Sequence, residues 1–195
     1  MRLALAHKDL PYELVPVSLA AGEHRAPTHL ARNPIGQVPV LEMTSGGEAV
    51  VIAQSVAILE YLEEIHPEPA LLPAGALARA RVRELVELVN AGIQPLQNST
   101  VLKHVASLGG DSGEWARHYI LKGLLAFEER TRGTRGRFSF GDSPTLADVF
   151  LVPQMFNARS LDLDMRALGP LVEIDARCQE LPRWARAHPS RQPDA

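Results

Sequence analysis

The sequence is short of several features, and each shortage excludes a class of protein. One cysteine, Cys178, in 195 residues excludes an internal disulfide. The net charge is −3, with 20 basic and 23 acidic residues, whereas surfaces for nucleic acid or anionic membranes usually have a basic excess. No apolar run reaches the roughly 18 residues of a transmembrane helix, and the charged N-terminal stretch is too short for a secretory signal. We therefore expect a cytoplasmic protein with no nucleic-acid or membrane partner.

The composition, 46% hydrophobic, is ordinary for a globular protein. The two halves of the sequence differ in the elements that they predict. The first half predicts a helix at the start, strands over 12–19, 38–43 and 48–53, and a helix over 54–66. Prolines 67, 69 and 73 form a stiff connector. Beyond it, apolar residues at helical spacing predict four helices. The expected domains are an α/β domain at 1–66, a linker at 67–78 and an all-helical domain at 79–195.

The string NPIGQVPVLE, residues 33–42, raises the question of why a strand should begin with Val38-Pro39. A cis bond here would turn the N–H and C=O of Val38 out of the sheet, where they could pair with an extended peptide ligand. An ordinary edge-strand proline explains the dipeptide alone more simply.

Gln54 and Ser55 stand where a strand gives way to a helix. Free N–H groups and the helix dipole make such a junction an anion site, and Ser55 could also cap the helix. The two roles are compatible.

Thr145 and Asp148 have the spacing of a capping box, so we interpret them as a folding device with a buried, hydrogen-bonded Asp148. Cys178 lies in an apolar helical pattern and is interpreted as a small buried hydrophobe. None of the seven histidines has metal-ligand spacing, and we expect no metal.

Taken together, several strings resemble the glutathione transferases, and more closely their zeta class, the maleylacetoacetate isomerases. They include NPIGQVPVLE, AQSVAILEYLEE, GIQPLQN, GDSPTLADVFLVPQ and the terminal HPSRQPDA. The resemblance covers the whole chain. It implies a thioredoxin-like α/β N-terminal domain, an all-α C-terminal domain, glutathione as cofactor, a small-molecule substrate and a homodimer.

The resemblance also implies roles for individual residues. Val38, before a cis Pro39, would pair with the cysteinyl backbone of glutathione, and Gln54 and Ser55 would hold its γ-glutamyl carboxylate. His24 stands near the glycyl end, where the family often has Gln. The implied substrate-binding residues are Gln94, Asn98, Ser99, Thr100 and Arg159.

The function that this resemblance implies is glutathione-dependent cis–trans isomerisation of maleylacetoacetate to fumarylacetoacetate, in tyrosine and phenylalanine catabolism. The thiolate adds to the conjugated double bond, the adduct rotates, and the thiolate leaves. The alternatives are a general glutathione transferase, a maleylpyruvate isomerase, and a non-catalytic glutathione-binding protein.

Two departures from the family pattern qualify that function. The chain opens inside the first helix, so the family's first strand and its thiolate-stabilising serine loop lie outside it, and no catalytic residue is assigned. We expect about 15–20 further residues upstream, the length of a strand plus its loop, and poor activity without them. Second, Ser160 follows Arg159 where many isomerases have another Arg, which favours maleylpyruvate as a competing substrate.

Overall fold

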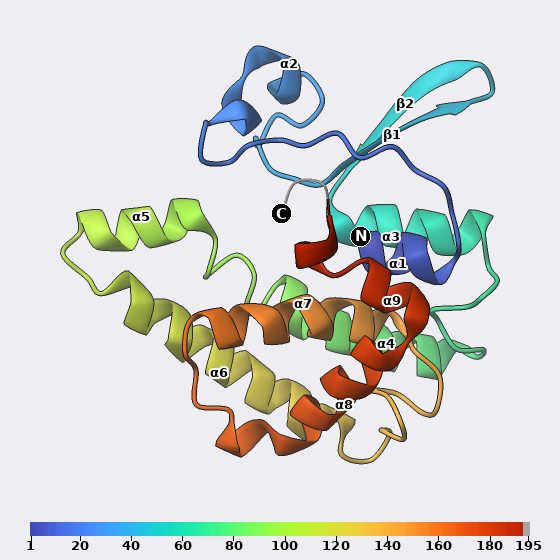
Figure 1. The fold of residues 1–195 in the computed structure, drawn as a ribbon, viewed down its shortest axis with the longest axis vertical. Coiled ribbons are helices and arrows are strands. Elements are labelled where there is room, and N and C mark those ends of the chain that lie inside the picture. Colours follow the sequence, from blue (N-terminus) through green and yellow to red (C-terminus); the bar gives the residue numbers. More distant parts are fainter. Residues whose placement is uncertain (193–195) are drawn as a thin grey trace. The chain divides into compact units, whose positions relative to one another are not determined.

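The computed structural model describes residues 1–192, which form two compact units (Figure 1). The first unit holds Met1–Pro69 and the segment that begins at Arg186, and the second holds Ala70–Ala185. The elements of the first unit are α1 (Arg2–His7), η1 (Glu23–Arg25), α2 (Pro27–Leu30), β1 (Val40–Ser45), β2 (Glu48–Ala53), α3 (Ser55–Ile65) and η3 (Pro189–Arg191). The elements that begin in the second unit are α4 (Ala76–Asn90), α5 (Ser99–Ser107), α6 (Ser112–Thr131), α7 (Leu146–Ser160), η2 (Arg166–Leu168), α8 (Gly169–Glu180) and α9 (Pro182–Arg186).

Strands β1 and β2 form the predicted hairpin. They pair antiparallel, from Val40 opposite Ala53 to Ser45 opposite Glu48. The connecting glycines at 46 and 47 both have positive φ, 60° and 87°, which a tight two-residue hairpin turn of this kind requires. The Gly-Gly signal in the sequence is therefore confirmed.

The strand predicted over residues 12–19 is wrong. The structure assigns no strand there, and Val15 is 72% exposed. Alternation of apolar and polar residues favours a strand, but a strand exists only through ladder hydrogen bonds to a neighbour. Within residues 1–192, the sheet consists of β1 and β2 alone, and this segment pairs with neither of them.

The core of the first unit lies between α1 and α3, which run side by side in Figure 1. Leu5 packs against Ile58 and Leu62, and Leu41 and Ile52 of the hairpin pack on the same cluster. Lys8 is buried beside this core. Its Nζ lies 2.7 Å from Glu63 Oε2 and donates to the carbonyl of Pro69 at 3.0 Å. A buried ammonium is tolerated only with such partners, and these fix α1 to the end of α3.

The second unit contains the four predicted helices as α4, α6, α7 and α8. Helices α5 and α9 were not predicted, and α4 ends at Asn90 although its apolar pattern runs on to Leu96. Ile93, in the turn beyond α4, is completely buried against α6. The close approach requires Gly123, because a Cβ there would overlap Ile93 Cγ1. The helices α4, α6 and α7 pack on one another to form this core.

Residues 1–192 contain neither a membrane-spanning helix nor a group of side chains suited to a metal ion. No helix in this range is both long and apolar enough to cross a bilayer. No three His, Cys, Asp or Glu side chains of the same range are grouped so that they could hold a metal ion.

Candidate glutathione site

The turn that leads into Val38 is built by Asn33, Pro34 and Gly36. Gly36 N–H donates to the Asn33 carbonyl at 2.8 Å, which closes a four-residue turn with proline at its second position. The Asn33 side-chain oxygen accepts from Ile35 N–H at 3.3 Å. Gly36 has φ of 65°, and a Cβ there would lie 3.0 Å from the carbonyl oxygen of His24. Glycine is needed for both reasons, and the turn sets the direction of the next peptide.

The peptide bond between Val38 and Pro39 is cis, as predicted. Among residues 1–192, no hydrogen bond uses the N–H or the C=O of Val38. Val38 is 43% exposed. The backbone therefore offers a donor and an acceptor on one residue, the arrangement that a strand-like peptide ligand would use.

The register of the hairpin brings Val38 and Ser55 to the same end. The last pair is Val40 with Ala53, so Val38 lies two residues before this pair and Ser55 two residues after it. Between them in the chain, Gln54 is held at φ 75° and ψ 119°, outside the usual regions for a residue with a side chain. Such a conformation costs about 1–3 kcal/mol and clusters at functional sites.

Helix α3 begins at Ser55 with an uncapped N-terminus. Its first internal hydrogen bond runs from Ile58 N–H to the Gln54 carbonyl at 3.0 Å, and no side chain caps the end. The N–H groups of residues 55–57 are therefore free of helical partners. With the helix dipole behind them, these groups suit a carboxylate. The Ser55 hydroxyl lies at the same position, so the residues present fit the glutathione carboxylate that the sequence implied.

His24 lies in η1, in the same unit. Within residues 1–192, its Nδ1 is a buried atom without a hydrogen-bond partner. Its position near the glycyl end of glutathione stays a prediction.

The substrate-binding residues that the sequence implied lie in the second unit. Asn98 caps α5, because its side-chain oxygen accepts from Thr100 N–H at 3.0 Å. Ser99 and Thr100 form the exposed first turn of α5, and Gln94 is exposed in the turn after α4. These four residues thus lie on one stretch of chain, from the turn after α4 to the first turn of α5. Their contact with a substrate stays a prediction.

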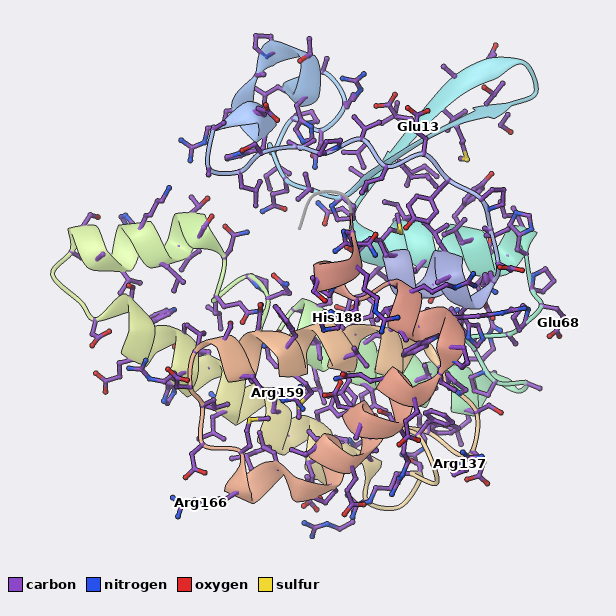
Figure 2. The ribbon with its side chains drawn as sticks, viewed as in Figure 1. Glu13, Glu68, Arg137, Arg159, Arg166 and His188 are labelled. Atoms are coloured by element: carbon purple, nitrogen blue, oxygen red, sulfur yellow. The ribbon has the colours of Figure 1, made fainter. Side chains whose placement is uncertain are left out.

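Arg159 comes from the last turn of α7 and is labelled in Figure 2. Its guanidinium lies 2.6 Å from Oδ2 of Asp175, a completely buried residue of α8. The Arg159 side chain is 42% exposed, and its guanidinium has more donors than the pair with Asp175 uses. The sequence did not indicate the pair with Asp175, which ties α7 to α8. A substrate role for Arg159 would have to coexist with that pair.

Sequence analysis also missed the two residues that hold the turn before Val38. His29 and Asn33 are both buried, and both donate to the carbonyl oxygen of Gln37. Asn33 opens the string NPIGQVPVLE but was given no role there, and the spacing of His29 from Asn33 is too common to single His29 out. In the second unit, the amide groups of Gln97 and Gln154 form a reciprocal pair, at 2.7 and 3.2 Å, that no periodic pattern indicates.

Asp148 and Cys178 have the structural roles that were predicted. Thr145 and Asp148 form the capping box of α7, and Asp148 is completely buried. Burial raises the pKa of the Asp148 carboxyl, and hydrogen bonds from Ser139 and Thr145 oppose that rise. Cys178 is buried in α8, and burial raises the pKa of its thiol far above the ordinary value. A protonated, enclosed thiol is a poor nucleophile.

Fold and site together define a class of protein in which a thioredoxin-like domain, with unpaired backbone groups at one end of its hairpin, is followed by a helical domain. The family model "Glutathione S-transferase, N-terminal domain" matches residues 1–64. The maleylacetoacetate isomerase of Rhizobium meliloti (strain 1021) is 45% identical over 98% of this chain and 90% of its own length. A maleylpyruvate isomerase of a Ralstonia species is 41% identical, over 100% of this chain and 93% of its own.

A solved structure gives the same relationship. The maleylacetoacetate isomerase of Anaeromyxobacter dehalogenans 2CP-1, with glutathione in its active site, has a TM-score of 0.91 and 51% identity, over 100% of this chain and 90% of that one. A second structure of that enzyme, with the same scores and coverage, holds dicarboxyethyl glutathione and citrate in the active site. The chain belongs to the maleylacetoacetate isomerase family, the zeta class of glutathione transferases.

Proposed function

We propose that this protein is a glutathione-dependent isomerase that converts maleylacetoacetate to fumarylacetoacetate. One observation carries the proposal: the free backbone groups of Val38 and the uncapped N-terminus of α3 lie at the same end of the hairpin. This end matches a ligand that is part peptide and part carboxylate, as glutathione is.

Each residue of the glutathione site has a binding task. Val38 N–H and C=O pair with the cysteinyl backbone, which fixes the tripeptide along the sheet edge. Ser55 and the first N–H groups of α3 hold the γ-glutamyl carboxylate, and Gln54 lies beside them. His24 lies toward the glycyl end. When bound, glutathione supplies a thiolate that adds reversibly to the conjugated double bond, so that the bond can rotate.

The relatives support this choice of substrate. Proteins named maleylacetoacetate isomerase match the chain over nearly its whole length, and one of them holds a glutathione derivative that carries two added carboxylates. Exposed donors in the second unit, such as Gln94, Thr100 and the free face of Arg159, suit a substrate with a carboxylate at each end.

Maleylpyruvate is the second candidate substrate. A relative of that name is 41% identical to this chain, and Ser160 stands where a further arginine would suit the longer substrate. We also propose that the protein works in the cytoplasm, in tyrosine and phenylalanine catabolism, and as a homodimer.

The test is an assay of the full-length gene product on both cis substrates, with and without glutathione, with the trans product identified by proton NMR. We expect turnover only with glutathione, and faster turnover of maleylacetoacetate. Conjugation of small electrophiles at a higher rate than either isomerisation would indicate a general transferase instead. Tight binding of glutathione without turnover of any substrate would leave a glutathione-binding protein and refute the isomerase.

A further inference from the structure

We propose that His29 and Asn33 are positioning residues that aim the N–H of Val38 at glutathione by holding the carbonyl of Gln37. The proposal rests on the function proposed above, since it concerns the same cofactor. It adds two side chains that do not touch the ligand themselves. We call them the carbonyl clamp.

The clamp consists of two donors that converge on one oxygen. His29 Nε2 lies 3.0 Å from the Gln37 carbonyl oxygen, and Asn33 Nδ2 donates to the same atom at 2.8 Å. A carbonyl oxygen only accepts, so Nε2 of His29 carries the proton. His29 and Asn33 are 7% and 4% exposed, so both donors are buried, and the two bonds to the Gln37 oxygen are partly buried. A carbonyl oxygen with two donors engaged has little freedom to turn.

The planarity of the peptide group transmits this restraint to Val38. The carbonyl of Gln37 and the N–H of Val38 belong to one trans peptide unit, in which the two bonds point in opposite directions. Holding the oxygen toward His29 and Asn33 therefore turns the Val38 N–H away from α2. That N–H is the donor for which residues 1–192 provide no acceptor.

Hydrogen bonds at the carbonyl also change the donor at the other end. Two donors polarise the amide, and a polarised amide has a more acidic N–H that donates more strongly. The clamp therefore contributes in two ways, by fixing the direction of the Val38 donor and by strengthening it. Preorganisation of this kind lowers the cost of ordering the site when a ligand binds.

The clamp is rigid because its two members hold each other. The N–H of Asn33 donates to the carbonyl of His29 at 2.9 Å, and the N–H of His29 donates to Ala26 at the start of α2. The side-chain oxygen of Asn33 is occupied by Ile35 N–H, so its amide nitrogen is left to face Gln37. Both contacts are made to the main-chain oxygen of Gln37, so the exposed side chain of Gln37 takes no part in them.

The experiment measures glutathione affinity in four variants by isothermal titration calorimetry. Asn33→Asp keeps the oxygen for Ile35 but replaces the donor by an acceptor, and His29→Phe removes the other donor. His29→Gln restores an amide donor near the position of Nε2, and Gln37→Ala removes only a side chain. We expect Asn33→Asp and His29→Phe to bind glutathione about tenfold more weakly, a change of about 1.4 kcal/mol. His29→Gln and Gln37→Ala should stay near the wild type.

A stability-matched variant separates positioning from loss of fold. Ile58→Val thins the core of the first unit without touching the clamp, and its unfolding free energy can be compared with those of the clamp variants. The clamp variants should raise KM for glutathione and leave kcat at saturating glutathione almost unchanged. If they bind glutathione as tightly as Ile58→Val, the clamp is refuted. If the wild-type protein itself fails to bind glutathione, the proposed function fails first.

A measurement on the wild type covers the case in which the variants do not fold. NMR of the labelled protein should show a slowly exchanging Hε2 proton on His29, with a coupling across the hydrogen bond to the carbonyl carbon of Gln37. Adding glutathione should move the Val38 amide proton downfield while this coupling persists. An unprotonated Nε2 on His29, or a Val38 amide proton whose chemical shift does not change when glutathione is added, would overturn the proposal.

Discussion

Asp148 offers the sharpest test of how the helical unit is held together. Its Oδ1 accepts from Ser139 N–H at 2.8 Å, and its Oδ2 accepts from Thr145 N–H at 2.8 Å and from the Thr145 hydroxyl at 3.2 Å. All three residues are buried. One carboxylate thus closes the cap of α7 and also satisfies the backbone of the loop before it.

The cost of Asp148→Ala follows from the groups that it leaves unpaired. Loss of a helix cap costs about 0.5–2 kcal/mol, and a buried N–H without an acceptor, here that of Ser139, costs about 1–3 kcal/mol. Together they give roughly 1.5–5 kcal/mol. Burial of the carboxylate, which raises the pKa of Asp148, destabilises the folded wild type. The substitution removes that cost too, so the loss of unfolding free energy is smaller than three charge-assisted hydrogen bonds would give.

The assay is urea unfolding at pH 7, followed by far-ultraviolet circular dichroism, with Asp111→Ala as the matched control. Asp111 also accepts two backbone N–H groups, at the start of α6, but it is exposed, so water can replace it. We expect Asp111→Ala to lose less than Asp148→Ala, and Asp148→Asn to fall between the wild type and Asp148→Ala. A loss below about 0.5 kcal/mol for Asp148→Ala, the range of neutral surface changes, would refute the reasoning.

Three further predictions test other parts of the chain. Ser55→Ala should weaken glutathione binding by about 1.5–3 kcal/mol in calorimetry, and an unchanged affinity would leave Ser55 with no part in carboxylate binding. Burial keeps the folded Cys178 thiol protonated while the unfolded thiol ionises near pH 8.5. Unfolding free energy should therefore fall above that pH, by up to about 1.4 kcal/mol per unit, and Cys178→Ala should lack this slope. Gly123→Ala should cost about 1–3 kcal/mol in thermal melts by overlap with Ile93, whereas Gly133→Ala, with open space around it, should be nearly neutral.

Local signals in the sequence predicted the elements that local physics determines. Apolar spacing predicted the long helices, two adjacent glycines predicted the hairpin turn, and the spacing of Thr145 and Asp148 predicted the cap of α7. Each depends on residues within a few positions of one another. Helix α5 was missed because it is only nine residues long and none of them is buried. Its apolar residues Val101, Leu102 and Val105 have helical spacing, but they span too few turns for a periodic pattern to stand out.

Contacts between distant segments could not be predicted in the same way. The strand expected over 12–19 had the right alternation, but a strand is decided by its neighbour, not by its own residues. Arg159 was assigned from family pattern to a ligand, while its observed partner, Asp175, lies 16 residues away on another helix. A side chain with several donors can serve both, and nothing in a linear pattern tells which partner it meets.

In the glutathione site, the residues that make the motif recognisable are not the groups that would bind the ligand. The string NPIGQVP is recognisable because Pro34, Gly36 and Pro39 are constrained by backbone geometry. The groups that would contact the ligand, however, are the N–H and C=O of Val38, which every residue except proline possesses. Their usefulness depends on where the preceding carbonyl points, and therefore on His29 and Asn33, which sequence analysis passed over. Substitutions at 38 that keep a non-proline backbone should thus be tolerated better than substitutions at 29 or 33, although residue 38 is the one of these three that would touch glutathione.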